Sequence, residues 1–259
     1  MQDIIFNKRQ YLSTFKNVKA GLNSLDKYRN LFPIRPSSHL AGIVADLTGD
    51  GHISQGLIQY ISKYKNEALR FRDEFNFLFG KRGKIRKGPT SKDTWECVIG
   101  DNALVKILNF SGVPFGNKTI KKFEVPKWVL NGNKNIRSRY VQRLFDCEGS
   151  VFLQNKRRIR IKLQLYKLSD YELNLRKYLN QIREMLSEFG IKTTNLTYTG
   201  IIKRKDNSIS RGIEFEIYGT KKNLLSILNF QKYINFETKR KAKILNKSIR
   251  YLMPSQALV

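Results

Sequence analysis

Two stretches, LAGIVADLTGDGHI (Leu40–Ile53) and YVQRLFDCEGSV (Tyr140–Val151), decide the fold of this chain. In each, apolar residues at helical spacing lead to one acidic residue, then a glycine, then a strand-like segment. The acidic residues are Asp50 and Glu148, 98 positions apart. An acid that recurs at the end of two helices predicts a paired-carboxylate site for metal ions.

The composition predicts an anionic partner. The 259 residues include 49 Lys plus Arg against 21 Asp plus Glu, a formal net charge of +28, and the basic residues are spread along the whole chain. Such an excess usually neutralises phosphates, so the expected polyanion is nucleic acid. No segment approaches the ~18 apolar residues of a membrane-spanning helix, and the N-terminus lacks the apolar core of a signal peptide. We therefore expect no membrane partner.

The counts of reactive residues exclude several classes of protein. With only Cys97 and Cys147, the chain has neither a disulfide framework nor a zinc cluster. This cysteine usage predicts an intracellular, reducing compartment, either the cytoplasm of a prokaryote or an organelle matrix. His39 and His52 are too few for histidine-dependent nuclease schemes. No Gly-Lys-Ser/Thr phosphate loop is present, which argues against NTP-driven chemistry.

The sequence also contains an internal duplication. Similar residues recur at an offset that only grows along the chain, from 98 to 121 positions. Duplication followed by loop insertions in the second copy produces such a drift, whereas chance matches would scatter. The matched positions are Asp50 with Glu148 (98), Lys63 with Lys167 (104), Phe79-Gly80 with Phe189-Gly190 (110), Gly100 with Gly219 (119), Ile-Leu-Asn-Phe at 107–110 and 227–230 (120), and Phe115 and Lys118 with Phe236 and Lys239 (121).

We predict an α+β fold of two pseudo-symmetric αββαββα repeats with antiparallel sheets. The predicted organisation is a basic N-terminal extension at 1–35, a first repeat at 36–112, a linker at 113–134 and a second repeat at 135–259. Besides the two motif helices, the first repeat is expected to contain strands Leu57–Lys63, Gly83–Thr90 and Thr94–Ile99, with a turn at Ser91-Lys92-Asp93, and helices Glu67–Phe79 and Asn102–Phe110. The second is expected to contain strands Ser150–Gln154, Arg158–Lys167, Thr194–Lys203 and Ser210–Tyr218 and helices Tyr171–Phe189, Lys222–Phe230 and Thr238–Leu252.

One strand of the second copy predicts a DNA-binding sheet. In RRIRIKLQLYK (157–167) polar and basic side chains alternate with apolar ones, so one face is core and the other can donate hydrogen bonds. Basic two-stranded ribbons fit the major groove, although a solvated strand face is the alternative. Basic runs at Lys81–Lys87 and Lys203–Arg211 favour DNA binding. The candidate DNA-binding residues are Arg82, Lys84, Arg86, Arg158, Arg160, Lys162, Gln164, Tyr166, Lys203, Lys205 and Arg211.

With these motifs the chain resembles the LAGLIDADG homing endonucleases, specifically the single-chain type with two motif copies. The first copy contains Leu40-Ala41-Gly42 and ends in Gly49-Asp50-Gly51, and Arg143–Val151 matches a common variant of the second motif. Val125–Trp128 resembles the family's inter-domain segment. The resemblance covers about residues 37–252. It implies saddle-shaped DNA-binding sheets, with the two motif helices packed at the domain interface through small residues.

The resemblance also implies a metal-dependent reaction. Asp50 and Glu148 would hold divalent cations, with the backbone carbonyls of Gly49 and Cys147 nearby. Hard oxygen ligands with water-filled positions suit Mg²⁺, which can activate water and stabilise a leaving oxygen. Each acid would serve one DNA strand, giving a staggered double-strand cut. Asp46 is a rival for the first acid, but only Asp50 is followed by glycine and a strand start, as Glu148 is.

Two pairs of lysines are candidates for stabilising charge in the transition state. Lys118 and Lys239 follow Phe115 and Phe236 at matching repeat positions, and the family has basic residues around its metals. The second pair, Lys63 and Lys167, is expected at equivalent strand ends. Contact with phosphate or solvent is the alternative for each of these lysines.

The sequence therefore predicts a monomeric, site-specific, Mg²⁺-dependent DNA endonuclease. Its partner is a double-stranded DNA target. The chain begins with Met and lacks a Cys or Ser at position 1 and a terminal His-Asn, so we expect an intron-encoded or free-standing protein. One alternative is an intron maturase that binds structured intron RNA without cutting. Another is a nuclease-dead DNA-binding regulator, against which the presence of both acids argues.

Overall fold

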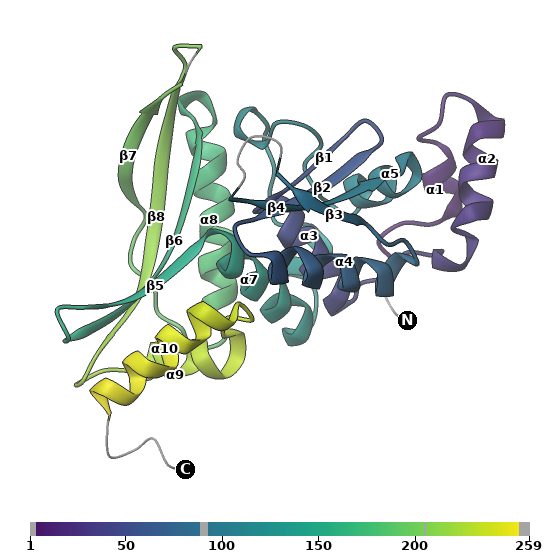
Figure 1. Ribbon diagram of the computed structural model, residues 1–259. Helices are drawn as coiled ribbons and strands as arrows, with labels where there is room; N and C mark the ends of the chain where they lie inside the picture. Colours follow the sequence, from purple (N-terminus) through teal and green to yellow (C-terminus); the bar gives the residue numbers. More distant parts are fainter. Residues whose placement is uncertain (1–3, 89–92, 205, 254–259) are drawn as a thin grey trace. The chain divides into compact units, whose positions relative to one another are not determined.

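The chain divides into two compact units, each with its own sheet and core (Figure 1). The structure, a computed structural model, describes residues 4–88, 93–204 and 206–253. The first unit comprises Met1–Asn117 with Pro126–Tyr140, and the second comprises Lys118–Val125 with Val141–Val259. The last of the three boundaries falls inside helix α7 (Lys134–Glu148), after Tyr140.

The first unit contains a four-stranded antiparallel sheet of order β1-β2-β4-β3. Ser37 accepts a hydrogen bond from the Leu40 amide and so begins α3, and Gly80 ends α4 in the left-handed conformation (φ 64°). Ile58 and Tyr60 point to the core, and Tyr60 stacks on Phe71 of α4 at 4.7 Å. The elements are α3 (Ser38–Thr48), β1 (Gly51–Ser54), β2 (Leu57–Ser62), α4 (Lys65–Phe79), β3 (Lys84–Lys87), β4 (Trp95–Gly100) and α5 (Asn102–Phe110).

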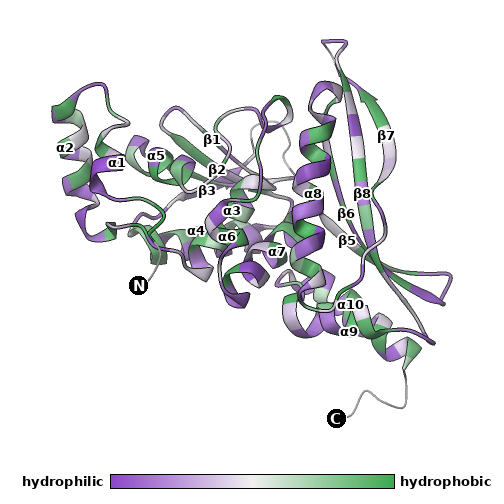
Figure 2. Cartoon of the chain, turned by 180° about the vertical axis from the view of Figure 1, so that it is seen from behind, coloured by the Kyte–Doolittle hydropathy of each residue, from purple (hydrophilic) through white to green (hydrophobic). Residues whose placement is uncertain are grey.

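The second unit repeats this order with longer strands, and its antiparallel sheet has the order β5-β6-β8-β7. Alternate residues of β6 from Ile159 to Leu163 are buried, as are Ile213, Phe215 and Ile217 of β8, so one face of the sheet packs on helices. Figure 2 shows the corresponding alternation of apolar and polar residues along β8. The elements after α7 are β5 (Gly149–Gln154), β6 (Arg158–Leu168), η3 (Ser169–Tyr171), α8 (Glu172–Ser187), β7 (Thr197–Lys203), β8 (Ile209–Thr220), α9 (Leu225–Asn229), the π-helical turn η4 (Phe230–Ile234) and α10 (Lys239–Leu252).

The predicted α+β class and the αββαββα order of both repeats are confirmed. Most element bounds agree with the prediction to within three residues. The predicted turn at 91–93 falls largely outside the described residues. The helix expected from Lys222 begins only at Leu225, because Thr220 and Asn223 exchange backbone hydrogen bonds (3.0 and 2.9 Å) and form a turn there.

The N-terminal extension is folded and packs on α5. It contains α1 (Lys8–Leu12), α2 (Val18–Lys27) and η1 (Arg29–Leu31). The Asp101 carboxylate accepts bonds from Lys27 Nζ and Tyr28 Oη, both at 2.6 Å, and also from the first amides of α5. Burial acts to raise the pKa of Asp101, but these bonds outweigh it and hold the pKa below its ordinary value. The extension is thus attached by a carboxylate that is ionised at neutral pH.

The linker segment also has structure. It contains η2 (Lys118–Ile120) and α6 (Lys127–Leu130). Asn174 of α8 bonds to both the amide and the carbonyl of Phe123 (3.0 and 2.9 Å), which fixes this segment on the second unit. Among the described residues, none of the helices is both long and apolar enough to cross a membrane.

Candidate functional site

The two candidate acids occupy the same local structure. Asp50 stands between the C-cap of α3 and the first residue of β1, and Glu148 is the last residue of α7, directly before β5. Both are partly exposed. In each unit the helix turns at once into a strand, so the backbone closes tightly behind the acid. The acid is therefore held at a fixed end of a packed helix.

Glycine is required at this turn. A Cβ at Gly51 would lie 2.6 Å from the Leu47 Cα atom, and one at Gly149 would lie 2.5 Å from the Phe145 carbonyl oxygen. Both distances are shorter than any real Cβ contact, so a larger residue would force the helix and strand apart. This explains why the acid–glycine pair recurs in both copies.

Asp46, the rival for the first acid, lies inside α3. Its side chain is fully buried (0% exposed) and accepts bonds from Arg70 Nη1 at 2.9 Å and Arg70 Nη2 at 3.1 Å. A carboxylate that binds a metal together with a substrate phosphate must reach solvent. The geometry therefore favours Asp50, and gives Asp46 the role of joining α3 to α4.

The donors at each helix end fit a hard divalent cation. The first unit presents the Asp50 carboxylate after the carbonyl of Gly49, and the second presents Glu148 after that of Cys147. Among the described residues, no group of three or more His, Cys, Asp and Glu side chains could hold a metal. A small set of carboxylate and carbonyl oxygens, which leaves positions for water and phosphate, is what Mg²⁺ prefers. The metal-binding role of these residues stays a prediction.

The strand register corrects the predicted equivalence of Lys63 and Lys167. Gly51 pairs with Tyr60 and Gly149 pairs with Leu163, so β2 and β6 correspond at an offset of 103 (163 minus 60). Lys63 therefore corresponds to Tyr166. A slip of one residue moves a side chain to the opposite face of a sheet. Accordingly Lys63 is exposed, whereas Lys167 is on the buried face (3% exposed).

Lys167 binds the linker segment. Its ammonium donates to the Lys121 carbonyl (2.6 Å) and to Asn174 Oδ1 (2.5 Å), and lies 3.8 Å from the centre of the Phe123 ring. Burial lowers the pKa of Lys167 to about 8. These contacts give Lys167 a structural role in the second unit, and its catalytic role stays a prediction.

The other candidate lysines lie at the starts of helical segments. Lys118 opens η2 and is partly exposed, and Lys239 is the exposed first residue of α10. Their part in the chemistry also stays a prediction.

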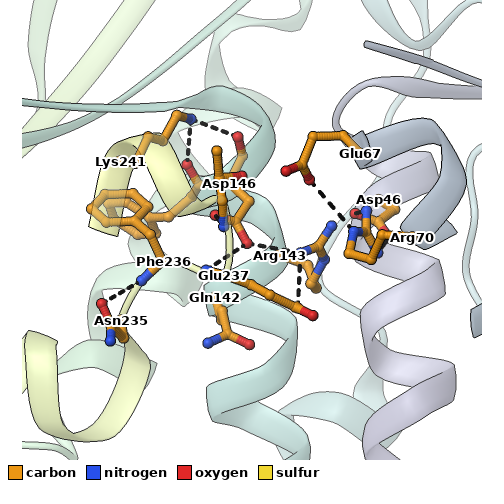
Figure 3. A network of polar contacts seen from close by, with 12 residues as sticks. Asp46, Glu67, Arg70, Gln142, Arg143, Asp146, Asn235, Phe236, Glu237 and Lys241 are labelled. Atoms are coloured by element: carbon orange, nitrogen blue, oxygen red, sulfur yellow. Dashed lines mark hydrogen bonds and ion pairs between the residues drawn. The ribbon is translucent and has the colours of Figure 1, made fainter. Parts of the chain in front are cut away.

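Sequence reasoning missed Lys241, whose ammonium is directed at the end of α7 (Figure 3). It is buried (7% exposed) and donates to the carbonyls of Phe145 (3.0 Å), Asp146 (2.5 Å) and Gly149 (2.6 Å). These carbonyls surround Glu148 in the sequence, and a cation there also opposes the negative end of the helix dipole. Only its position two residues after Lys239 could have drawn attention to it.

Asp146 completes a reciprocal link between α7 and α10. Its carboxylate accepts from the amides of Thr238 (3.0 Å) and Glu237 (3.2 Å) at the start of α10, and from the buried Arg143 guanidinium (2.8 Å). Burial raises the pKa of Asp146 to about 6, although the bonds from Thr238 and Glu237 and the charge of Lys241 act to lower it. Each helix thus satisfies the other's terminal groups, which fixes the helix end that bears Glu148.

The open face of the second sheet has the predicted composition. Arg160, Lys162 and Gln164 are partly exposed and alternate with the buried Ile159, Ile161 and Leu163. The cations are not isolated, however. Arg160 pairs with Glu216, and Lys162 pairs with Glu214 at 2.8 Å, both on β8. Sequence reasoning did not foresee these carboxylates, because cross-strand neighbours follow from the register.

Arg211, a predicted DNA-binding residue, lies on the other face of this sheet. It is paired in register with Lys167 and shares the side of the sheet occupied by the buried Ile213 and Phe215. Its guanidinium pairs with Glu172 of α8 at 3.0 Å.

The remaining DNA-binding candidates are placed as follows. Arg82, Lys84, Arg86, Arg158 and Lys203 are exposed, Tyr166 is partly exposed and accepts a bond from Gln164 (2.7 Å), and Lys205 lies outside the described residues. Contact with DNA stays a prediction for all of them.

Comparison with known families identifies part of this arrangement. The sequence profile of a LAGLIDADG-like domain matches residues 135–235, which include the α7–β5 acid site and all four strands of the second sheet. Residues 135–235 are similar to a LAGLIDADG-like domain. The match confirms the resemblance carried by the second motif. The first unit has the same order of elements around Asp50, as expected of the type with two motif copies.

Two curated relatives align with most of the chain, including residues outside 135–235. The chain is 28% identical over 240 residues to the tRNA-splicing ligase RtcB of Pyrococcus furiosus, an alignment covering 84% of this chain and 24% of that protein. It is 23% identical over 214 residues to the replication factor C small subunit of Methanocaldococcus jannaschii, covering 82% and 10%. The chain thus spans a quarter or less of these relatives.

Among solved structures, a mesophilic variant of the homing endonuclease I-DmoI is similar at a TM-score of 0.48 and 14% identity. The similarity covers 76% of this chain and 90% of that one.

Proposed function

We propose that the chain is a site-specific homing endonuclease that makes a staggered double-strand cut in a long DNA target by Mg²⁺-dependent phosphodiester hydrolysis. The observation that carries this proposal is the repeated helix–acid–glycine–strand unit, which presents one partly exposed carboxylate in each unit. The net charge of +28 supports a polyanionic substrate. We further propose a monomer that acts in a reducing, intracellular compartment.

The relatives support a mobile element. A ligase and a replication factor share no activity, yet each contains a segment like this chain that makes up 24% or 10% of its length. The shared segment therefore carries a function separate from either named activity. Insertion into unrelated host genes is what homing produces. We propose that this chain is encoded by an intron. The alternative is that its coding sequence is inserted in frame in the gene of a host protein.

The described residues have distinct roles in the proposed reaction. Asp50 and Glu148 would hold Mg²⁺, together with the carbonyls of Gly49 and Cys147. When bound, the ion would supply an activated water and stabilise the leaving 3′-oxygen. Lys241 fixes the end of α7 and so holds the Glu148 carboxylate in place.

Cleavage assays with charge-removing variants test this proposal. Purified protein with Mg²⁺ should cut a plasmid carrying the intronless host sequence and leave the intron-containing copy intact. Asp50→Asn and Glu148→Gln should each abolish double-strand cleavage while DNA affinity is retained, because only the metal ligand is lost. Asp46→Asn is the matched control, and loss of cleavage there with retention in Asp50→Asn would reassign the first acid. Tight binding of intron RNA without DNA cleavage would instead indicate a maturase.

A further inference from the structure

The open faces of both sheets contain a carboxylate at the same register position. β4 and β8 correspond at an offset of 118, because Tyr60 pairs with Cys97 and its counterpart Leu163 pairs with Phe215. Glu96 therefore corresponds to Glu214. In the first sheet Glu96 accepts from Gln59, and in the second Glu214 accepts from Lys162, the counterpart of Gln59. The same diagonal contact between the second and third strands thus occurs in both units.

These carboxylates lie beneath the donors that they bind. The Glu96 side chain is 0% exposed and also accepts from Arg86 Nε at 2.5 Å. In the second sheet Glu216 accepts from Arg160 Nε at 2.6 Å and from Arg160 Nη2, and its side chain is 11% exposed. Burial acts to raise the pKa of Glu216, but the bonds from Arg160 and Lys162 outweigh it and hold the pKa below its usual value. The carboxylate is therefore ionised at neutral pH.

A phosphate-binding surface would not be built in this way. Like charges repel, and two carboxylates offset the two cations of Arg160 and Lys162, so this patch attracts a DNA backbone weakly. Other basic residues of the same sheets are better suited to phosphates. Lys84 and Arg158 lie on the open faces by register, and neither takes part in any of the described ion pairs. The sheet faces therefore contain a charge-balanced patch as well as exposed cations.

The carboxylates instead fix the orientation of hydrogen-bond donors on the open faces. A guanidinium has five N–H donors in a fixed plane, and Glu216 takes two of them from one edge of Arg160. The opposite edge is held in one orientation, because Arg160 Nη1 donates to Gln154 Oε1 at 3.2 Å. Bidentate donation from Arg to the O6 and N7 atoms of guanine is the most common specific contact in the major groove. One amide N–H of Gln59 is donated to Glu96. The side-chain carbonyl and the second N–H of Gln59 are then left to bond to adenine.

We infer that Glu96, Glu214 and Glu216 determine sequence specificity, by orienting Gln59, Arg86, Arg160 and Lys162 toward base edges and by keeping phosphates off the patch. The half-site opposite the second sheet then contains guanine facing Arg160 and Lys162, and the one opposite the first contains adenine facing Gln59. This inference rests on the proposed recognition of double-stranded DNA, and does not depend on cleavage.

The decisive experiment compares two charge-matched double variants of the full chain. Glu214→Gln with Glu216→Gln removes two carboxylates from the open face. Glu184→Gln with Glu188→Gln removes two exposed carboxylates from the end of α8, which packs on the buried face of the same sheet. Affinity for a random-sequence duplex is measured against salt concentration, and sequence preference is measured by selection from a randomised duplex library. Thermal melting shows whether each variant folds.

The open-face variant should bind random duplex on the order of 5- to 30-fold more tightly than the control variant at 0.1 M salt. Its salt slope should steepen by up to about 2, since about 0.9 counterion is released per added phosphate contact. It should also lose the guanine preference that the wild type and the control retain. Equal affinities and an unchanged selected sequence would overturn the inference.

A second variant covers the case in which the double variant does not fold. Arg160→Lys keeps the charge but removes the planar fork, so it should lose about 10-fold in guanine preference while binding random duplex like the wild type. Retained preference would overturn the inference. Failure of the wild type to bind duplex DNA would sink both this inference and the proposed function. Selective binding without any cleavage would leave the inference standing and sink the endonuclease proposal alone.

Discussion

The two units support their motif helices with different polar contacts. In the first unit, Asp46 inside α3 pairs with Arg70 of α4. In the second, the register counterpart of Asp46 is Leu144, and α7 is instead joined to α10 by Lys241 and Asp146. Duplication has thus kept the backbone, the acid and the glycine, while the side chains that hold each helix in place differ. Changes at corresponding positions should therefore have unequal effects.

The largest expected effect is at the Asp46–Arg70 pair. Arg70→Met leaves a fully buried carboxylate without its guanidinium, which should lower the free energy of unfolding by about 3–5 kcal/mol. Adding Asp46→Leu should recover much of the loss, because the buried charge is then removed as well. Urea unfolding of both variants measures this. A double variant as unstable as the single one would show that packing, and not the charge, dominates.

The lysines at matching repeat positions test whether the two copies share their chemistry. Lys118→Met and Lys239→Met should each slow single-turnover cleavage by about 10²–10³, or roughly 2–4 kcal/mol, if each lysine stabilises charge in the transition state. Rates are measured with DNA saturated by protein. If a lysine only contacts phosphate, its replacement by Met should weaken DNA binding and reduce the salt slope by about one. The rate at saturating protein should then be unchanged.

A smaller effect is expected at Lys241, which bonds to the carbonyls at the end of α7. Lys241→Met leaves the carbonyls of Phe145, Asp146 and Gly149 without this donor, which should destabilise the protein by about 1–3 kcal/mol. Because Glu148 is then less firmly held, cleavage of one strand should slow more than that of the other. Nicked intermediate should accumulate on a supercoiled plasmid. Equal slowing of both strand cuts would contradict a role specific to the α7 end.

Most of the fold could be predicted because local signals agreed with one another. Helical spacing, caps and the acid–glycine turns fixed the order of elements, and the growing offset exposed the duplication. The errors came from register. Lys63 and Lys167 were predicted to be equivalent because both are lysines near a strand end, but the pairing of β5 with β6 shifts them by one residue and so to opposite faces.

The candidate site was predictable only where chemistry and local sequence coincide. The two acids are marked by their own neighbours in the sequence. By contrast, Lys241 bonds to carbonyls more than 90 positions away, and nothing local distinguishes it from the exposed lysines around it. Glu214 and Glu216 are likewise recognisable only when β6 and β8 are paired.

The smallest effects should separate Lys63 from Lys167. Lys63→Met should change the free energy of unfolding by less than about 0.5 kcal/mol, because the side chain is exposed. Lys167→Met removes bonds to Lys121 and Asn174, and its effect should depend on pH. The folded-state pKa of about 8 lies below the ordinary 10.5, so the unfolded state binds more protons between these values. The free energy of unfolding of the wild type should therefore increase relative to that of Lys167→Met as pH rises from 8 toward 10.5.

Unfolding of the wild type and both variants at pH 7, 8.5 and 10 measures this difference. The Lys63 variant should follow the wild type at every pH, since no buried group is changed. The free energy of unfolding of the Lys167 variant should differ from that of the wild type by about 1–3 kcal/mol at the highest pH. A pH-independent difference would mean that the ammonium remains charged in the folded protein throughout. Its bonds to the linker would then outweigh the cost of burying its charge.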